Sequence, residues 1–288
     1  MTRYLIITLV LAASAFGSGT RNGPVRSLLP ALEETGADAT TYALYERDNF
    51  TARLHTDGVM RIYLKQNGEI VGKPIVFGQP AGNYYHRTKR EIQRRNVAAY
   101  YDPADPIRNP KSIELTGRLE GNLSFTIKYE FAQSTIRVTG RHQQVAGIKN
   151  PIQFIVNTAI PSLASDSENE PNRDGSYKLD VPDKMLKRFV LETSELVDGR
   201  THKKFYQYTD RNAKFSGPVK HAKIRGPWGS RTVRLRSRKM RGKLMGKLTD
   251  GGNRNYGTWG LLLGYEFFFY TLQDDEENNY ASYSISIN

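Results

Sequence analysis

The sequence predicts an all-β fold, an antiparallel β-sandwich of the jelly-roll or concanavalin-like type. Three observations predict it. Apolar and polar residues alternate with period two along several segments, as in a strand with one buried face and one solvated face. The dipeptides Asp57-Gly58 and Asn67-Gly68 separate such segments and favour tight hairpin turns. Aromatic residues make up 11% of the chain, and their flat rings pack well on a sheet.

The first 19 residues have the pattern of a signal peptide. Arg3 precedes an apolar run, Tyr4–Leu11, and small residues follow it at 12–15. The run is too short to span a bilayer comfortably. We therefore expect residues 1–19 to be removed, and the mature protein to be secreted or periplasmic without a transmembrane segment.

The remainder of the chain consists of a short polar segment followed by one domain. Residues 20–41 are small and polar, which indicates a linker or a poorly ordered arm. Residues 42–288 show no sharp shift in composition and no internal repeat, so we expect a single β-sandwich domain there.

The first half of this domain contains closely spaced strands and one helix candidate. Residues 50–54 and 59–65 alternate on either side of the first turn, and a third run covers 70–77. Residues 88–99 are the best candidate for a helix, although a short one. The segment 100–110 contains three prolines and is predicted to be a loop.

The second half repeats the strand signals. Residues 113–119 and 123–131 flank a turn, and the second of these segments alternates cleanly between apolar and polar. Further strands are expected at 136–143, 152–160, 186–196 and 203–209. Residues 261–272 are almost continuously apolar, which is typical of a central strand, and 280–287 alternate again.

Composition excludes several classes of function. The chain has no cysteine, so it has no disulfide, thiolate nucleophile or thiolate metal site. It contains no phosphate-binding loop, dinucleotide fingerprint or histidine pair with metal-ligand spacing. We expect neither a cofactor nor a metal. The net charge of +13 favours an anionic partner.

Most of the excess charge lies between Lys220 and Leu248, which contain eleven lysines and arginines and no acid. If 232–238 forms a strand, its arginines share one face at a spacing of about 7 Å, and Val233 and Leu235 face the core. The turn Gly226-Pro227-Trp228-Gly229, which precedes residues 232–238, would hold the ring of Trp228 near the surface, where it could stack on a sugar. The candidate ligand-binding residues are Arg225, Trp228, Arg231, Arg234, Arg236, Arg238 and Lys243. The alternative is a solvated face neutralised by the acidic segments 165–174 and 274–277.

Five residues are candidates for catalysis. β-Elimination in an acidic polysaccharide needs a cation for the carboxylate, a base and an acid, and histidine and tyrosine serve as the last two. The candidates for these roles are Tyr85, His86, His142 and Tyr256. Glu266 lies in the apolar 261–272 run, where a carboxylate must be partnered or protonated, so it is a candidate acid. The alternative is that all five are structural.

Three functions remain open. The first is an exported module that binds an acidic polysaccharide or another polyanion through the basic segment. The second is a polysaccharide lyase or glycoside hydrolase, and the third is an envelope-associated structural protein. No recognition-helix or RNA-binding motif is present, which argues against nucleic acid as the partner.

Overall fold

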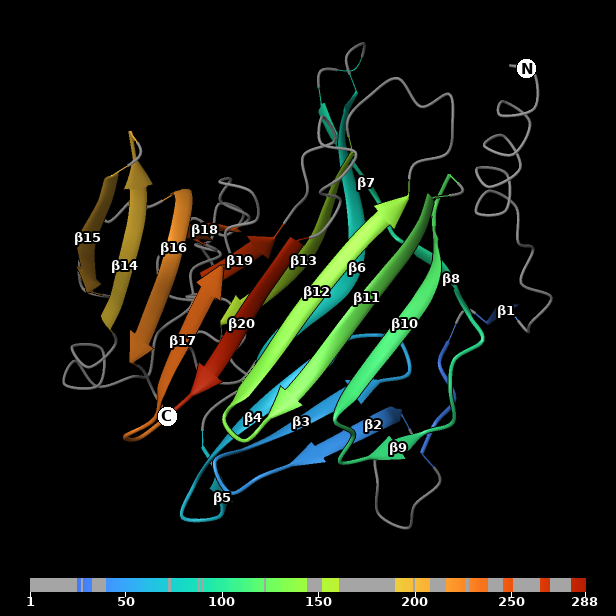
Figure 1. The fold of residues 1–288 in the computed structure, drawn as a ribbon, viewed down its shortest axis with the longest axis horizontal. Helices are drawn as coiled ribbons and strands as arrows, with labels where there is room; N and C mark the ends of the chain where they lie inside the picture. Colours follow the sequence, from blue (N-terminus) through green and yellow to red (C-terminus); the bar gives the residue numbers. More distant parts are fainter. Residues whose placement is uncertain are drawn as a thin grey trace, which may run out of the picture.

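The computed structural model describes residues 25–26, 28–32, 40–71, 74–86, 89, 91–121, 123–143, 152–160, 190–198, 200–207, 216–225, 228–237, 246–250, 265–269 and 281–288. All regular structure in these parts is β-strand (Figure 1), so the prediction of an all-β fold is confirmed for them. The same parts contain no helix of the length and apolarity that crossing a membrane requires.

One sheet, here called sheet A, consists of antiparallel pairs throughout the described residues. Its strands lie side by side in the order β1 (Val25–Arg26), β8 (Val97–Tyr101), β10 (Ser112–Leu119), β11 (Leu123–Ala132), β12 (Thr135–Gln143), β20 (Ala281–Ile287), β17 (Thr232–Ser237), β16 (Ser216–Arg225), β14 (Val190–Val197) and β15 (Arg200–Gln207).

The other sheet, sheet B, is antiparallel except at the parallel pair that β9 makes with β2. Its strands follow the order β9 (Ile107–Arg108), β2 (Thr41–Glu46), β3 (Phe50–His55), β4 (Met60–Gln66), β6 (Ile75–His86), β13 (Ile152–Ile160), β19 (Tyr265–Phe269) and β18 (Gly246–Asp250). Two short strands extend this sheet, because β5 (Glu69–Ile70) pairs with β4 and β7 (Glu91–Arg95) pairs with β6.

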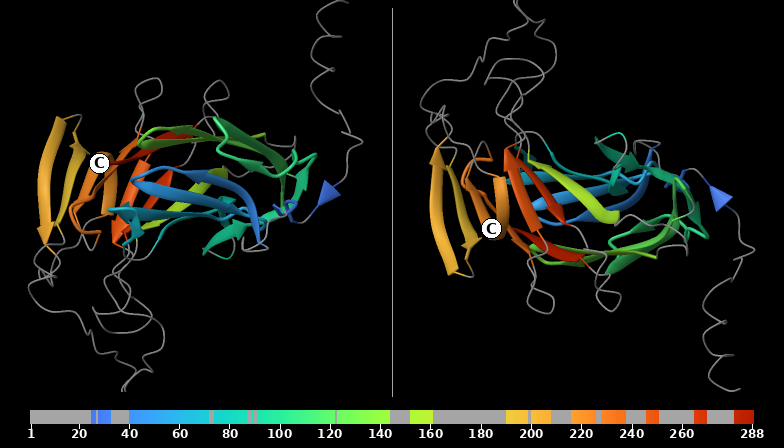
Figure 2. Two further views of the ribbon diagram at one scale, coloured as in Figure 1. Left: turned by 90° about the horizontal axis from the view of Figure 1, so that it is seen from below. Right: turned by 90° about the horizontal axis from the view of Figure 1, so that it is seen from above.

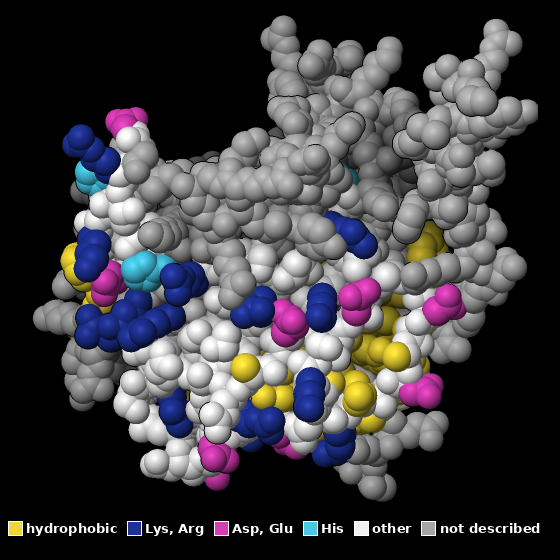
Figure 3. Space-filling view, viewed as in Figure 1, with side chains coloured by type: hydrophobic (Ala, Val, Ile, Leu, Met, Phe, Trp, Pro, Cys, Tyr) yellow, Lys and Arg dark blue, Asp and Glu magenta, His cyan; other side chains and the backbone are white. Residues whose placement is uncertain are grey.

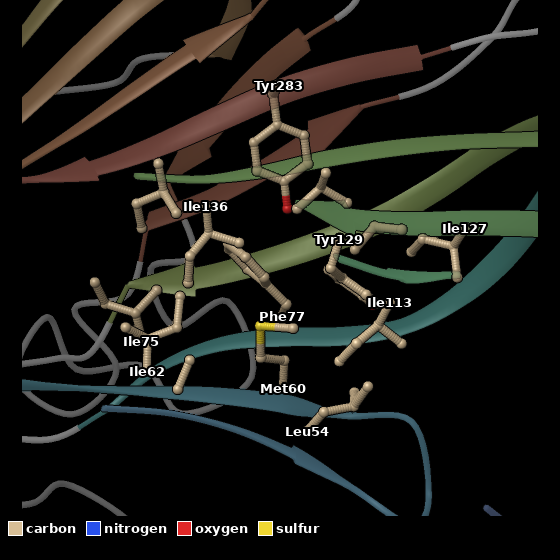
Figure 4. Packing of buried hydrophobic residues seen from close by; sticks show 14 of the residues in the cluster. Leu54, Met60, Ile62, Ile75, Phe77, Ile113, Ile127, Tyr129, Ile136 and Tyr283 are labelled. Carbon is tan, nitrogen blue, oxygen red and sulfur yellow. The ribbon is translucent and has the colours of Figure 1, made fainter. Parts of the chain in front are cut away.

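The two sheets face each other as the layers of a sandwich (Figure 2). Strand β16 connects them at one side, because residues 216–218 pair with β18 and residues 221–225 pair with β17. The core lies between the layers, where the ring of Tyr283 of sheet A lies 5.6 Å from the ring of Phe77 of sheet B (Figure 4). The predicted antiparallel sandwich is therefore confirmed, whereas its jelly-roll or concanavalin-like type stays a prediction.

Alternation along the strands explains which face each sheet buries. In β11, Phe125, Ile127 and Tyr129 are buried, and the polar residues between them are partly or fully exposed. Burying such side chains contributes about 1.5–3 kcal/mol each. Sheet A consequently has one apolar face toward sheet B and one polar face toward solvent.

The prediction of a helix at 88–99 is wrong. Most of this segment forms β7 and β8, which pair with β6 and β10. The pairing satisfies the backbone polar groups, and it buries Ala99 and Tyr100 against the core. Burial and cross-strand pairing override the modest helix propensity of the sequence.

Part of the predicted linker at 20–41 packs onto the sandwich. Leu29 is buried in the hydrophobic core, and its backbone N–H donates to the carbonyl of Thr56. The backbone N–H of Leu32 donates to the carbonyl of Thr41. Residues 1–24, which include the predicted signal peptide, lie outside the described residues.

Candidate functional site

Strand β17 presents a row of arginines to solvent, as its alternation predicts. Val233 and Leu235 are fully buried in the core, and Arg234 and Arg236 are exposed on the opposite face. Arg238, the third predicted member of this row, lies outside the described residues.

The register of sheet A extends this row across neighbouring strands. Residues paired across antiparallel strands point to the same face of the sheet. One cross-strand row on the outward face consists of Thr135, Ser286, Arg234, Lys223, Glu192 and Phe205. The next row consists of Arg137, Ser284, Arg236, His221, Ser194 and Lys203.

An open hollow of about 660 Å³ lies over these two rows. Its cationic lining residues are Lys203, Lys223, Arg234 and Arg236, and we call these four the basic face. Within the described residues, Glu192 is the only acidic side chain that lines the hollow. Its remaining lining residues are His221, Leu235, Asn288 and the hydroxyl-bearing Ser134, Thr135, Ser284 and Ser286. Figure 3 shows the lysine and arginine side chains gathered around a histidine over β14 to β17.

His221 lies among the residues of the basic face, and this environment lowers its pKa. Partial burial lowers the pKa of His221 from its usual 6.5, and the charges of Arg236, Lys203 and Arg234 lower it further. The carboxylate of Glu192 acts in the opposite direction without reversing the shift. The imidazole is consequently neutral near pH 7 and able to accept a proton.

Trp228 corrects one prediction about ligand binding. The sequence placed its ring near the surface as a stacking platform, but the side chain is fully buried in the core cluster. The side chain leaves the turn before β17, where the N–H of Arg231 donates to the carbonyl of Trp228, and its apolar area is removed from water. Phe205 on β15 is instead an exposed aromatic residue on the outward face of sheet A, with 63% of its surface in solvent.

The remaining ligand-binding candidates lie in different positions. Arg225 is exposed at the end of β16. The Nε of Arg231 donates to the carbonyl of Lys65 at 2.7 Å, so this side chain connects the turn before β17 to sheet B. Lys243 lies outside the described residues.

His142, one of the predicted catalytic residues, lies away from the basic face. It follows the buried residues Ile136 and Val138 on the core side of β12 and is itself only 3% exposed. Burial lowers its pKa. The arginines point outward from the same sheet, so the structure does not bring His142 and the arginine row into one groove.

The other predicted catalytic residues are located only in part. Tyr85 and His86 belong to the end of β6, where the backbone pairs with β7. Glu266 belongs to β19, which pairs with β13 on one side and β18 on the other, as expected of a central strand. The side chains of these three residues, and all of Tyr256, lie outside the described part of the chain.

Sequence reasoning missed the residues that complete the hollow. His221, Glu192 and Lys203 belong to strands β16, β14 and β15, and none of them forms a motif with the arginines of β17. Alternation signals were present along these strands, but alternation does not reveal which strands become neighbours. In the described ranges no group of three or more histidine or acidic side chains is arranged to hold a metal ion.

The fold and this face together define an all-β sandwich protein with a cationic outer surface. No family model matches the chain, and no curated protein matches its sequence. Among solved structures, a galactose mutarotase-like protein from Lactobacillus casei aligns over 85% of this chain and 99% of its own, with 8% identity and a TM-score of 0.46. A proposed aldose 1-epimerase from Escherichia coli K12 aligns over 85% of this chain and 98% of its own, with 7% identity and a TM-score of 0.46. These similarities are too low to carry an argument about function.

Proposed function

We propose that the basic face of sheet A binds an acidic polysaccharide. The observation that supports this proposal is the convergence of four cations from β15, β16 and β17 on one open hollow, where Glu192 is the single acidic side chain among the described lining residues. Like charges held together repel each other, and an anionic ligand relieves that repulsion. Guanidinium groups match carboxylate and sulfate groups with two parallel hydrogen bonds.

The geometry of the face favours a polymer with regularly spaced charges. Arg234 and Arg236 are two residues apart on one strand, which separates them by about 7 Å. Lys203 lies three strands away from Arg236, which corresponds to about 14 Å at the usual strand spacing. A polysaccharide with one anionic group per sugar or per two sugars can reach cations at such intervals.

Polar and apolar groups beside the cations also suit a sugar chain. Ser284 and Ser286 offer hydroxyls at the edge of the hollow, and Ser286 shares a 2.9 Å hydrogen bond with Thr135. The exposed ring of Phe205 offers a flat apolar surface for the C–H groups of a sugar ring. Export, as predicted from residues 1–19, would bring the basic face into contact with extracellular polymers.

Replacing both exposed arginines tests this proposal. The Arg234→Gln/Arg236→Gln variant should elute from pectate, alginate or heparin columns at lower salt than the wild type. Exposed ion pairs contribute up to about 1 kcal/mol each, so the affinity should fall by up to about 30-fold. Raising the salt concentration should weaken wild-type retention, because charges in solvent are screened over about 8–10 Å.

A matched variant separates this face from the overall charge. Arg94→Gln/Lys111→Gln also removes two exposed cations, but from β7 and from the residue before β10. It should elute close to the wild type, and neutral glucan should retain neither protein. Equal elution of the two double variants would show that net charge alone, and not the basic face, determines retention.

A further inference from the structure

His221 is placed where an acid–base group would act on a ligand bound to the basic face. Its backbone pairs with Arg236 on one side and with Ser194 on the other. Its side chain lines the same hollow as the four cations and is partly exposed there. A purely electrostatic surface has no need of a neutral imidazole at this point.

The register places His221 beside a cation that can hold a carboxylate. Paired residues of adjacent antiparallel strands have Cα atoms about 4.5–5.5 Å apart. In a uronic acid, the carboxylate and the acidic hydrogen are both attached to C5. If Arg236 binds that carboxylate, the C5–H bond lies within reach of the neighbouring imidazole, and the cation also stabilises the charge that develops when the proton leaves.

A proton donor is available on the same strand. Lys223 is two residues from His221, lies on the same face and lines the hollow. The spacing of about 7 Å between their Cα atoms is compatible with contacts to neighbouring atoms of one sugar, because both side chains extend over the hollow. The volume of about 660 Å³ lies within the usual range of ligand sites.

We propose that the basic face cleaves polyuronates by β-elimination, with His221 as the base, Arg236 as the carboxylate-binding group and Lys223 as the acid. This inference rests on the proposed binding of an acidic polysaccharide. The imidazole takes the C5 proton, the electron pair of that bond forms the C4=C5 double bond, and the C4–O4 bond breaks. The ammonium of Lys223 protonates the departing oxygen, and the proton on His221 then returns to Lys223 through solvent. The reaction consumes no water and needs no oxidant or cofactor.

The charges around His221 determine the expected pH dependence. The groups that face it are Glu192 on β14, Lys203 on β15, Lys223 on its own strand, and Arg234 and Arg236 on β17. Burial and the cations lower its pKa below 6.5, so the base is available at neutral pH. The cleavage rate should decrease as the pH falls through this lowered pKa, because the protonated imidazole cannot accept the C5 proton.

The experiment incubates the wild-type protein with pectate and with alginate and follows the ultraviolet absorbance of the new C4=C5 double bond, which is conjugated with the carboxylate. His221→Gln should lower the rate by about 100-fold or more, the usual contribution of a general base. Its retention on the same polymer columns should change little, because the neutral imidazole carries no charge. His202→Gln, on the exposed strand β15 and outside the hollow, is the matched control and should keep the wild-type rate.

The possible outcomes separate this inference from the proposed function. A wild-type protein that binds pectate or alginate but releases no unsaturated product from either overturns the inference and leaves the binding proposal intact. Full activity in both His221→Gln and His221→Asn overturns the role of His221. A wild-type protein that binds none of the polymers contradicts the proposed function itself. Circular dichroism of each variant establishes that it is folded.

Discussion

At the scale of single residues, two glycines show how backbone freedom and packing contribute separately. Gly58 and Gly68 both occupy hairpin turns with positive φ angles, +84° and +85°. Residues other than glycine rarely adopt this backbone conformation. The two sites differ in their surroundings, because a Cβ at Gly58 would collide with the hydroxyl of Tyr100, whereas Gly68 has open space around it. Tyr100 is buried and donates a hydrogen bond to the carbonyl of Asp57.

This difference predicts unequal effects of alanine at the two turns. Gly68→Ala should destabilise the protein by about 1 kcal/mol, which is the penalty of the left-handed conformation alone. Gly58→Ala should destabilise the protein by the same conformational penalty and by ~1–3 kcal/mol more, because the buried Tyr100 side chain has to move. Urea denaturation of the two variants measures the difference. Equal losses of stability would mean that the Tyr100 side chain moves aside at no cost in folding free energy.

At the scale of elements, one buried hydrogen bond connects the two layers of the sandwich. Thr158 on β13 of sheet B and Tyr283 on β20 of sheet A share a hydrogen bond between their hydroxyl groups. Both side chains are fully buried. Burial also raises the pKa of Tyr283, so its hydroxyl stays protonated and able to take part in the bond. The contact therefore fixes the position of β20 over β13.

A double-mutant cycle should reveal this connection. Tyr283→Phe should destabilise the protein by about 1–3 kcal/mol, because it leaves the hydroxyl of Thr158 buried without its partner. Thr158→Val should have a comparable effect for the same reason. The double variant should lose less stability than the sum of the two, with a coupling energy of about 0.5–3 kcal/mol. Strictly additive losses in urea denaturation would argue against a stabilising bond between the layers.

At the scale of the whole molecule, histidines couple folding to pH. Burial lowers the pKa of His142, and burial with nearby cations lowers the pKa of His221, each from 6.5. The unfolded chain therefore binds protons at a higher pH than the folded protein does. Stability should decrease as the pH falls below about 6.5, because protonation favours the unfolded state in that window. The lowered pKa of Glu130 acts in a separate window below 4.5, where protonation removes its interactions with Lys128 and Arg137.

Replacement of the more deeply buried histidine tests this linkage. Between about pH 7 and pH 5, the free energy of unfolding of the wild type should fall. His142→Gln should flatten this dependence, since the amide does not titrate, even if the variant is less stable at every pH. The measurement is urea denaturation across the pH series. An unchanged slope in His142→Gln would assign the pH dependence to other groups.

The sequence by itself determined the class of fold and the local direction of many side chains. Period-two alternation and Asp-Gly or Asn-Gly turns are properties of neighbouring residues, so they predicted the strands around Gly58 and the outward direction of Arg234 and Arg236. The tertiary structure alone decided which strands lie next to each other. It made strands of residues 91–95 and 97–99, where the local pattern favoured a helix, and it buried Trp228, where a turn favoured exposure.

The candidate site is one of the features that only the tertiary structure decided. Lys203, His221, Arg236 and Ser284 come from four separate strands, and the pairing of β15, β14, β16, β17 and β20 aligns them in one row. The physical reason is that alternation specifies the face of a strand, whereas its partner and register depend on long-range backbone pairing and on the fit of the whole core. The sequence therefore predicted a row of charge along one strand, and the tertiary structure placed a neutral imidazole beside it.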